Sequence, residues 1–511
     1  MEDKPKLDRT QFFDKNDLTS DYFQSITRKH QPIWCKCLWG LIIVSCLGFT
    51  IYTVYNLLHD YFEYNSYNQD SISWKSEVVL PAMTICNLNV VDNSQWKDKI
   101  TDDNLEAELD WYLKEIIIKT KKGDKFQDEE RARKLDEIEV DGEKIHISKD
   151  LHSDFKTFLL GDGESHPSME FADKWVEMQD IKYNFLNTEL GNCLVLNDDQ
   201  YFVQKLGGVL GGFTIDLNAK LENYLLSTRW AGFMLYLRDP YELVLNNLDG
   251  IYLAPGKETF VSIEREDITR LKAPHGTCRD THSMFNSSKQ LTIRECIQQE
   301  YFIESIKHCD CIPWHFVEAI QTAFTSQPQQ FYDYMAQNGL TEAFPLEELD
   351  EAVCGYPKSV QCDLSVTEIL ESIEIDELCH EPCAYSDWKH QTSSGKFPAT
   401  KGYFSEFLET FIVEPNAEVL QEYKSGYEYA TENYARVHVF YNDLKIINID
   451  QTKAYEVFNF ISEFGGATDL LIGLSFFTMF QLFEIFIAYM VFKCCPRKEK
   501  ENSTDQAKET V

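Results

Sequence analysis

Two long apolar runs interrupt an otherwise mixed pattern of apolar and polar positions. The first extends from Leu38 to Leu58 without a charged residue, and the second extends from Leu470 to Phe492. A helix needs about 20 apolar residues to cross the hydrocarbon core of a bilayer. Each run is therefore predicted to be a membrane-spanning helix, and the segment between them contains no other apolar run of that length.

The second run differs from an ordinary anchor because it carries small and polar residues. Gly473 and Ser475 are small, and Gln481 and Glu484 follow at a spacing that places them on one face of a helix. A carboxylate facing lipid costs roughly 2.5–3.5 kcal/mol, so Glu484 is expected to face other helices or water. The pattern fits either a single anchor with a packing notch for a partner helix or a helix that lines a pore.

Basic residues lie on the outer flank of each run, before the first (Arg28, Lys29, Lys36) and after the second (Lys493, Arg497, Lys498, Lys500). The positive-inside rule therefore predicts that both termini are cytoplasmic. The expected segments are a cytoplasmic N-terminus (1–35), a first span (36–60), an extracellular domain (61–463), a second span (464–493) and a cytoplasmic C-terminus (494–511).

The extracellular segment mixes strand and helix patterns. Residues 77–87 and 434–449 are rich in β-forming residues, and Pro81 in the first of these predicts a strand edge or a strand start. Residues 252–264 read as a turn followed by an alternating strand. Helical spacing of apolar residues is found at 103–119 and 365–378.

Charge and cysteine content narrow the class of protein. The formal net charge of −36 makes nucleic acid an improbable partner and suits cations or a basic ligand. The extracellular segment holds an even set of cysteines, which favours a disulfide framework over zinc binding in an oxidising compartment. These are Cys86, Cys193, Cys278, Cys296, Cys309, Cys311, Cys354, Cys362, Cys379 and Cys383. Residues 278–383 should form a mainly helical lobe that is cross-linked by disulfide bonds. Asn286 begins a glycosylation sequon and is expected to be glycosylated.

Enzyme motifs are missing from the sequence. It contains no glycine-rich phosphate loop, no His-Glu-x-x-His and no Gly-x-Ser-x-Gly. Two classes of protein combine two spans, cytoplasmic termini and a large disulfide-rich domain. One is a trimeric channel, and the other is a two-pass receptor without a pore. No cofactor is predicted.

Several segments, taken in order, resemble the degenerin/epithelial sodium channel family, and especially its acid-sensing and peptide-gated branches. The segment at 80–87 is similar to the Pro-Ala-x-Thr-x-Cys-Asn motif that follows the first span of the family. The remaining matches are Gly191-Asn-Cys193, the segment 254–261, Pro274-x-Gly-x-Cys278 and Gly473-Leu474-Ser475.

The resemblance implies an α+β membrane protein whose subunits form homotrimers or heterotrimers in the plasma membrane, in contact with membrane lipids. Each subunit has two transmembrane helices and a hand-shaped extracellular domain with a β-sheet palm and a helical thumb and finger. The family conducts Na⁺ and is typically blocked by amiloride. Gly473, Leu474 and Ser475 match its selectivity filter, Ser462 matches its degenerin gating position, and Asp469 stands at its amiloride position. Beyond weak Ca²⁺ binding by Asp469, no metal site is predicted.

The family also implies a disulfide pairing. The implied bonds are Cys86–Cys193, Cys278–Cys383, Cys296–Cys379, Cys309–Cys362 and Cys311–Cys354. Thumbs of the acid-sensing branch carry one further bridge, whose positions are occupied here by Glu300 and Glu377, so both of its partners are missing together.

The sequence departs from the family pattern at the inner pore. Asp21-Tyr22 stands where the family has His-Gly, and Gln481 replaces a frequent glutamate, while Glu484 is present one turn below. Three copies of this chain are therefore expected to build a poor inner pore, and heterotrimers with related subunits are expected to work better.

The gating stimulus is expected to be a neuropeptide, because of Asp469, the acidic extracellular domain and the missing thumb bridge. A small basic peptide would suit an acidic cleft. Proton gating and mechanical gating are the alternatives within the family. In another class, an ATP-gated trimeric channel shares the two spans, but it needs a Lys and Arg cluster for triphosphate that is not found here.

Overall fold

The structure is a computed structural model, and it describes the following parts of the chain. They are residues 33–89, 138–140, 143–145, 169–177, 180–188, 191–224, 230–240, 242, 250–284, 290–325, 328–340, 345–346, 349, 352–354, 356–373, 378–405, 425–472 and 487. The chain divides into two compact units. One comprises residues 1–67 and 453–511, and the other comprises residues 68–452.

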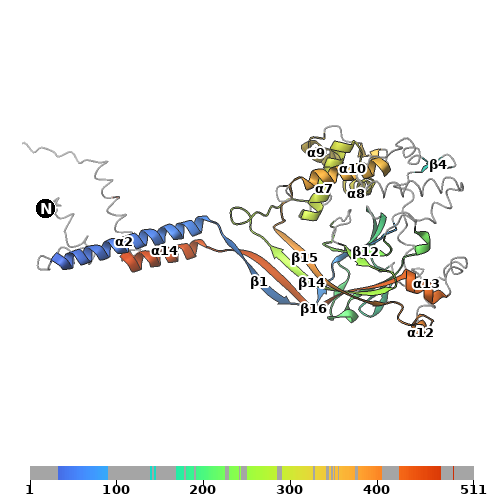
Figure 1. Ribbon diagram of the computed structural model, residues 1–511, viewed down its shortest axis with the longest axis horizontal. Coiled ribbons are helices and arrows are strands. Elements are labelled where there is room, and N and C mark those ends of the chain that lie inside the picture. Colours follow the sequence, from blue (N-terminus) through green and yellow to red (C-terminus); the bar gives the residue numbers. More distant parts are fainter. Residues whose placement is uncertain are drawn as a thin grey trace, which may run out of the picture. The chain divides into compact units, whose positions relative to one another are not determined.

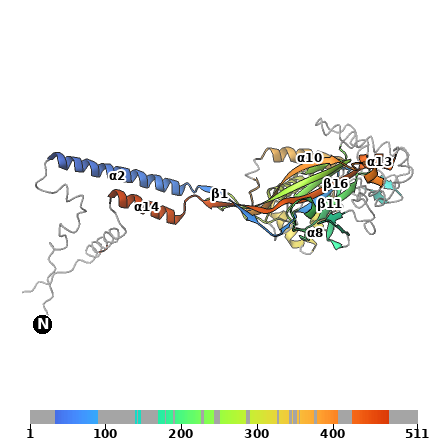
Figure 2. The ribbon, with the colours of Figure 1, turned by 90° about the horizontal axis from the view of Figure 1, so that it is seen from below.

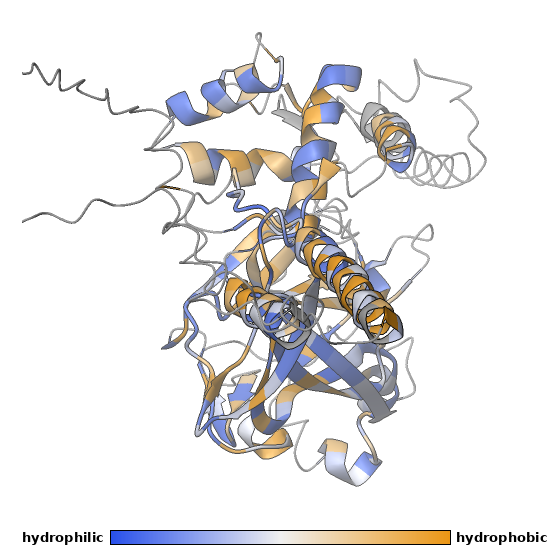
Figure 3. Cartoon of the chain, turned by 90° about the vertical axis from the view of Figure 1, so that its left-hand side faces the viewer, coloured by the Kyte–Doolittle hydropathy of each residue, from blue (hydrophilic) through white to orange (hydrophobic). Residues whose placement is uncertain are grey.

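The first unit contains two helices, α2 (Ile33–Phe62) and α14 (Val457–Ile472), which lie side by side (Figures 1 and 2). Within α2, residues Cys37–Phe62 form the one helix of the described chain that is long and apolar enough to cross a membrane. Most residues of this helix are apolar (Figure 3), and many of their side chains are exposed on its surface. That surface suits contact with lipid tails rather than with water.

The second unit is built around a seven-stranded sheet. Its strands lie in the order β15-β14-β16-β11-β6-β7, and β1 pairs with β16 outside this path (Figure 1). Most neighbours are antiparallel, but β14 and β16 run parallel. The strands are β1 (Ser66–Trp74), β6 (Met169–Phe171), β7 (Lys174–Val176), β11 (Phe213–Asn218), β14 (Lys257–Thr269), β15 (Ala384–Lys396) and β16 (Tyr434–Lys453).

A five-stranded sheet, in the order β13-β12-β3-β9-β8, completes the β-structure core. Its strands are β3 (Ala82–Asn87), β8 (Tyr183–Thr188), β9 (Gly191–Leu196), β12 (Phe233–Arg238) and β13 (Ile251–Leu253). One hydrophobic cluster draws residues from both sheets, including Ile85 of β3, Ile215 of β11 and Val437 of β16. Two small pairs, β2 (Val78–Val79) with β10 (Val203–Gln204) and β4 (Ile138–Val140) with β5 (Glu143–Ile145), lie outside these sheets.

Local sequence explains how two of these strands begin. Pro81 directly precedes β3, which is a central strand and fully buried, so the residue without an N–H group stands just before the hydrogen-bonded ladder. The prediction of a strand start at Pro81 is thus confirmed. Gly256, with φ of 71°, forms the turn before β14, where a Cβ atom would lie 2.2 Å from the carbonyl oxygen of Thr431.

A helical lobe is inserted between β14 and β15. It contains α7 (Ile293–Cys309), α8 (Trp314–Phe324), α9 (Pro328–Gln337) and α10 (Tyr356–Glu371), and it has a hydrophobic cluster of its own. The mainly helical character expected for residues 278–383 is found in the described part of this segment. The helix expected at 365–378 corresponds to the second half of α10, which begins earlier, at Tyr356.

Short helices complete the second unit, and they are η3 (Val209–Gly211), η4 (Leu221–Asn223), α12 (Lys401–Tyr403) and α13 (Gly426–Asn433). The strand expected at 434–449 is present as β16 and extends to Lys453. The turn expected within 252–264 lies at Pro255 and Gly256, between β13 and β14, and the strand expected after it is present as β14. The helix expected at 103–119 lies outside the described residues.

Candidate pore and gating sites

Helix α14 presents one aromatic face to α2. The ring of Phe460 lies 4.9 Å from the ring of Tyr61 near the end of α2, and Phe464, one turn further along, stacks on Phe460 at 6.0 Å. Residues four apart share a helix face, so Phe460 and Phe464 define the side of α14 that packs on α2. On the opposite side of α14, which we call its open side, the described side chains are exposed.

Ser462 and Asp469 lie on that open side. They are two helical turns apart, and both are exposed. Gly465 and Gly466 lie between them, and a Cβ atom added to either glycine would meet no atom within 4 Å. Small residues on an exposed helix face allow another helix to approach closely. Helix α14 begins at Val457, before the boundary at 464 that was expected for the second span.

The other predicted pore and processing residues lie outside the described part of the chain. They are Asp21, Tyr22, Asn286, Gly473, Leu474, Ser475, Gln481 and Glu484.

Five disulfide bonds are present, and their pairing is the one that the resemblance implies. Cys86–Cys193 joins β3 to β9 as a directly opposed cross-strand pair. The other four staple the helical lobe, and they are Cys278–Cys383, Cys296–Cys379, Cys309–Cys362 and Cys311–Cys354.

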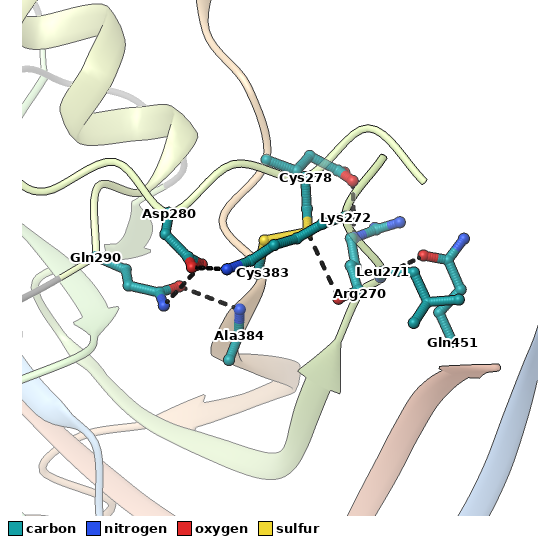
Figure 4. The surroundings of a disulfide bond; sticks show 10 residues. Arg270, Leu271, Lys272, Cys278, Asp280, Gln290, Cys383, Ala384 and Gln451 are labelled. Carbon is teal, nitrogen blue, oxygen red and sulfur yellow. Dashed lines mark hydrogen bonds and ion pairs between the residues drawn. A yellow bond between two sulfur atoms is a disulfide. The ribbon is translucent and has the colours of Figure 1, made fainter. Parts of the chain in front are cut away.

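The lobe meets the seven-stranded sheet at Cys278–Cys383 (Figure 4). In the turn after β14, the backbone N–H of Leu271 donates to Oε1 of Gln451 near the end of β16, at 2.8 Å. Gly276 closes this turn, because a Cβ atom there would lie 2.0 Å from the carbonyl oxygen of Leu271. The turn is therefore tied both to the base of the lobe and to the strand that precedes α14 in the chain.

Polar side chains reinforce the same joint. Gln290 Nε2 donates to Asp280 Oδ1 at 3.4 Å, and Gln290 Oε1 accepts from the backbone N–H of Ala384 at 3.1 Å (Figure 4). Lys272 forms an ion pair with Asp280. The base of the lobe and the start of β15 thus form one hydrogen-bonded joint.

A cleft of about 440 Å³ lies where the lobe, β12, β14 and β15 meet. Four carboxylates line it, from Asp239, Glu242, Asp267 and Glu295, and its described lining contains no Lys or Arg. Two arginines lie beside the lining: Arg265 Nε is 2.7 Å from Asp267 Oδ1, and Arg294 Nη1 is 3.9 Å from Glu242 Oε1. They compensate part of the charge of Asp267 and Glu242, but neither of these ion pairs involves Asp239 or Glu295. Its lining residues therefore make the cleft a region of negative potential that favours cationic ligands.

Sequence reasoning did not locate this cleft, because its acids come from three separate segments of the chain. The one local signal is the Thr-x-x-Glu pattern at the start of α7, which is typical of a helix N-terminus. Thr292 Oγ1 accepts from the backbone N–H of Glu295 at 3.2 Å and donates to Glu242 Oε1 at 2.7 Å. The helix cap thereby fixes one of the cleft carboxylates.

Two carboxylates outside the cleft resist ionisation. Burial raises the pKa of Glu300 in α7, and the nearby Glu304 raises it further, while Lys307 lowers it. Burial also raises the pKa of Glu170 in β6, with a smaller contribution from Asp173. These groups take up protons at a higher pH than ordinary glutamates do.

Two charged contacts connect strands of the seven-stranded sheet. Arg436 of β16 donates two hydrogen bonds to Asp216 of β11, at 2.5 and 2.7 Å. His438 bonds Glu258 of β14 through Nε2 and Thr214 of β11 through Nδ1, both at 2.8 Å. The hydrogen bond with His438 lowers the pKa of Glu258, although burial opposes this effect.

Comparison with known proteins connects these features to a family. The family model described as amiloride-sensitive sodium channel matches residues 22–485. Acid-sensing ion channel 1A of Danio rerio is 23% identical over 492 residues, covering 92% of this chain and 87% of its own length. The bile acid-sensitive ion channel of Homo sapiens is 21% identical over 469 residues, covering 90% of this chain and 82% of its own length.

Acid-sensing ion channel 1 of Gallus gallus is 24% identical and covers 93% of this chain and 83% of its own length. Among solved structures, a proton-activated chloride channel covers 88% of this chain and 98% of its own at 8% identity, with a TM-score of 0.30, which is too low to support an argument. The family consists of ion channels of the plasma membrane, not of enzymes, and its members assemble from homologous subunits and conduct Na⁺. On the extent of the family match, this chain belongs to the amiloride-sensitive sodium channel family.

Proposed function

We propose that this chain is a pore-forming subunit of a trimeric, amiloride-sensitive, Na⁺-selective channel that a basic peptide opens from outside. Both termini lie in the cytoplasm, and residues 61–463 face the extracellular space. The two spans correspond to α2 and to the helix that starts with α14. Because the chain belongs to the amiloride-sensitive sodium channel family, we do not propose an ATP-gated channel.

The open face of α14 supports the assignment of α14 to the pore. Phe460 and Phe464 occupy the side toward α2, so a neighbouring subunit approaches on the side of Ser462, Gly465 and Gly466. In a three-fold ring each subunit presents the same faces to its neighbours. Asp469 then contributes one carboxylate per subunit to the outer mouth, where three such charges concentrate cations.

The small size of two residues explains how the segment 473–475 forms a selectivity filter. Small residues at Gly473 and Ser475 let three backbones approach the axis, and freed carbonyl groups replace part of the hydration shell of a cation. A narrow ring of this kind favours Na⁺ over K⁺ by size. Gln481 and Glu484 line the pore below it.

The acidic cleft is the observation that supports a basic peptide as the agonist. Its volume of about 440 Å³ suits one or two side chains of a peptide, and four carboxylates line it without a lining cation. The cleft touches the start of β15 and the N-terminus of α7. A ligand bound there contacts both sides of the joint between lobe and sheet, and the end of β16 is tied to that joint through Leu271.

Expression in oocytes tests this proposal, with the chain alone and with related subunits, under perfusion with Arg- and Lys-containing peptides, acid and amiloride. We expect a peptide-evoked, amiloride-blocked Na⁺ current. Neutralising one cleft carboxylate, as in Asp239→Asn, should raise the half-activating peptide concentration about fivefold, because one close charge pair is worth roughly 1 kcal/mol in water.

The exposed Asp333 on α9 provides a matched control, since Asp333→Asn removes the same charge outside the cleft. Equal effects of the two variants would contradict a peptide site in the cleft. Absence of current with every partner subunit would instead favour a two-pass receptor without a pore.

Proton gating is the second candidate, favoured by the raised pKa of Glu300 and of Glu170. Relatives of this chain are named as acid-sensing channels. If acid alone evokes the current and Glu300→Gln shifts its pH dependence, protons rather than a peptide open the channel. Mechanical gating predicts instead a current that responds to membrane stretch and to neither ligand.

A further inference from the structure

A cluster of three potential metal ligands lies at the end of α2, apart from the pore residues and the cleft. His59, Asp60 and Glu63 offer one ligand atom each, and these three atoms lie within 4.8 Å of one another. His59 Nδ1 is 3.3 Å from Glu63 Oε1 and 3.8 Å from Asp60 Oδ1. All three side chains are about half exposed, so ions in solution have access to them.

These separations match those between the ligands of one small metal ion. Zinc binds imidazole nitrogen and carboxylate oxygen at about 2.0–2.2 Å, which places two ligands of a tetrahedral ion about 3.4 Å apart. The distance from His59 Nδ1 to Glu63 Oε1 has this value to within a few tenths of an ångström. The Asp60 carboxylate, 3.8 Å from His59 Nδ1 and within 4.8 Å of the Glu63 ligand atom, moves closer to complete the set when an ion binds.

The backbone and one outer residue hold the cluster in place. The N–H of Glu63 donates to the carbonyl oxygen of His59 at 2.9 Å, so the helical turn that carries the ligands is closed. Asn65 Nδ2 donates to Glu63 Oε2 at 2.8 Å, which turns the other oxygen, Oε1, toward His59. Outer hydrogen bonds of this kind orient metal-binding carboxylates and strengthen binding.

A second His–Glu pair in the described chain shows what this cluster has that an ordinary ion pair lacks. His308 Nε2 lies 3.1 Å from Glu304 Oε2 on α7, also at a spacing of four residues. There, Lys307 Nζ binds the other carboxylate oxygen at 2.6 Å, so a cation of the protein already compensates the charge of Glu304. At the end of α2 the third group is the carboxylate of Asp60, which adds a negative charge instead.

We propose that His59, Asp60 and Glu63 form a binding site for a transition-metal cation of the Zn²⁺ class, with water as the remaining ligand. Imidazole nitrogen suits Zn²⁺, Cu²⁺ and Ni²⁺, whereas Ca²⁺ and Mg²⁺ prefer ligand sets made of oxygen. The site lies on the extracellular side only if the proposed topology holds. Binding of the ion neutralises two carboxylate charges at the end of α2 in every subunit.

The test is a Zn²⁺ titration of the purified full-length chain in lipid nanodiscs, in competition with a chelating dye. The readout is binding, so it does not depend on channel activity or on which side of the membrane the site faces. We expect His59→Ala to lose one Zn²⁺ per chain, and Glu63→Gln and Asn65→Ala each to weaken binding about tenfold or more. A tenfold excess of Ca²⁺ or Mg²⁺ should leave Zn²⁺ bound.

The variant His308→Ala is the matched control, because it removes a histidine with the same glutamate spacing and should leave the Zn²⁺ count unchanged. A Zn²⁺ count in His59→Ala equal to that of the wild type would overturn the proposal, and so would displacement by Ca²⁺. If the count falls as expected while the chain conducts no current with any partner, the metal site stands and only the channel proposal fails.

Discussion

At the scale of single residues, the charged contacts of the seven-stranded sheet differ in how much they stabilise the protein. Arg436 and Asp216 are mostly buried, with side-chain exposures of 15% and 9%, and two hydrogen bonds join them. Arg436 also donates to Tyr403 Oη at 3.0 Å and lies 4.5 Å from the ring centre of Phe397. The guanidinium is therefore enclosed on several sides.

We expect Asp216→Ala to lower the free energy of unfolding by about 3–5 kcal/mol, because it leaves the buried charge of Arg436 without its partner. Asp387→Ala breaks an exposed ion pair with Lys389 in the same sheet, and it should cost at most about 1 kcal/mol. Thermal unfolding of the detergent-purified variants measures both. Similar losses for the two variants would show that burial does not set the strength of these pairs.

Glu258 makes stability depend on pH. Its pKa in the folded protein lies below the ordinary value of 4.5, chiefly because of its hydrogen bond with His438. The unfolded chain therefore takes up a proton first as the pH falls, and the stabilising contribution of Glu258 is lost as the pH drops below 4.5 and through the folded-state pKa. The contribution is complete at neutral pH.

The variant Glu258→Gln should accordingly be less stable than the wild type at pH 7, and the difference should shrink in acid. Unfolding midpoints measured from pH 7 to pH 3 test this trend. The variant Glu371→Gln, at an exposed position of α10, is the control. A difference that stays constant across this range would exclude a special role for the bond between Glu258 and His438.

The contacts of a single residue could be predicted from sequence only where its partner is a neighbour in the chain or is indicated by the family resemblance. The disulfide pairing, such as that of Cys311 with Cys354, followed from the resemblance and is present in the structure. The cleft acids Asp239 and Asp267 gave no signal, because only the tertiary fold brings the ends of β12 and β14 together.

At the scale of elements, α14 has two faces with different roles. The aromatic face packs on α2, and the open face carries Ser462 and Asp469. In the proposed channel this open face approaches its symmetry mates when the gate shuts.

Replacing Ser462 with a bulky residue should therefore raise the resting current. A phenylalanine that cannot be packed in the closed state costs roughly 1–3 kcal/mol, which shifts a two-state equilibrium by about 5–150-fold. Whole-cell recording of Ser462→Phe tests this, with Ile461→Phe as a control at the neighbouring exposed position. Unchanged resting current, with normal surface expression, would argue against a closed-state constriction at Ser462.

Asp469 should bind external Ca²⁺ weakly, because three carboxylate ligands at the outer mouth suit a hard cation. We expect Asp469→Asn to reduce block of the current by external Ca²⁺. Glu463→Gln is the control, since Glu463 lies on the flank of α14, where Tyr455 bonds it. Equal Ca²⁺ sensitivity in Asp469→Asn and wild type would place Asp469 away from the path of the ions.

A few elements, but not their pairing, could be predicted from sequence. β-rich composition located β3 and β16, and helical spacing located part of α10. The parallel pairing of β14 with β16 was not predictable, because 20 residues of mixed pattern in β16 do not specify which strand lies beside them. Which strands pair is determined instead by the hydrophobic core that they share, in which Val261 of β14 and Val437 of β16 are both buried.

At the scale of the whole molecule, we expect the identity of the other subunits to decide whether the pore conducts. By the family resemblance, Asp21 and Tyr22 stand where the family has His-Gly, and Gln481 stands where it often has a glutamate. We expect small currents from this chain alone and larger currents when related subunits supply His-Gly. Whole-cell recording of each combination measures this difference.

A lone subunit that passes large Na⁺ currents would refute the expected need for partners while leaving the channel assignment intact. If the lone subunit is silent, Asp21→His combined with Tyr22→Gly should restore part of the current. Failure of this double variant would shift the cause from the N-terminus to Gln481.

The Cys278–Cys383 bond has a further consequence for how this molecule can change over evolutionary time. The Cα atoms of these two cysteines are 5.0 Å apart, and β14 and β15 pair in unbroken register from Lys257 and Lys396 to Thr269 and Ala384. For the two strands, the lobe is therefore an insertion at the tip of a hairpin. Its surface can diverge between relatives wherever it does not pack on the rest of the fold, as α8 does on β8 and Thr292 does on Glu242.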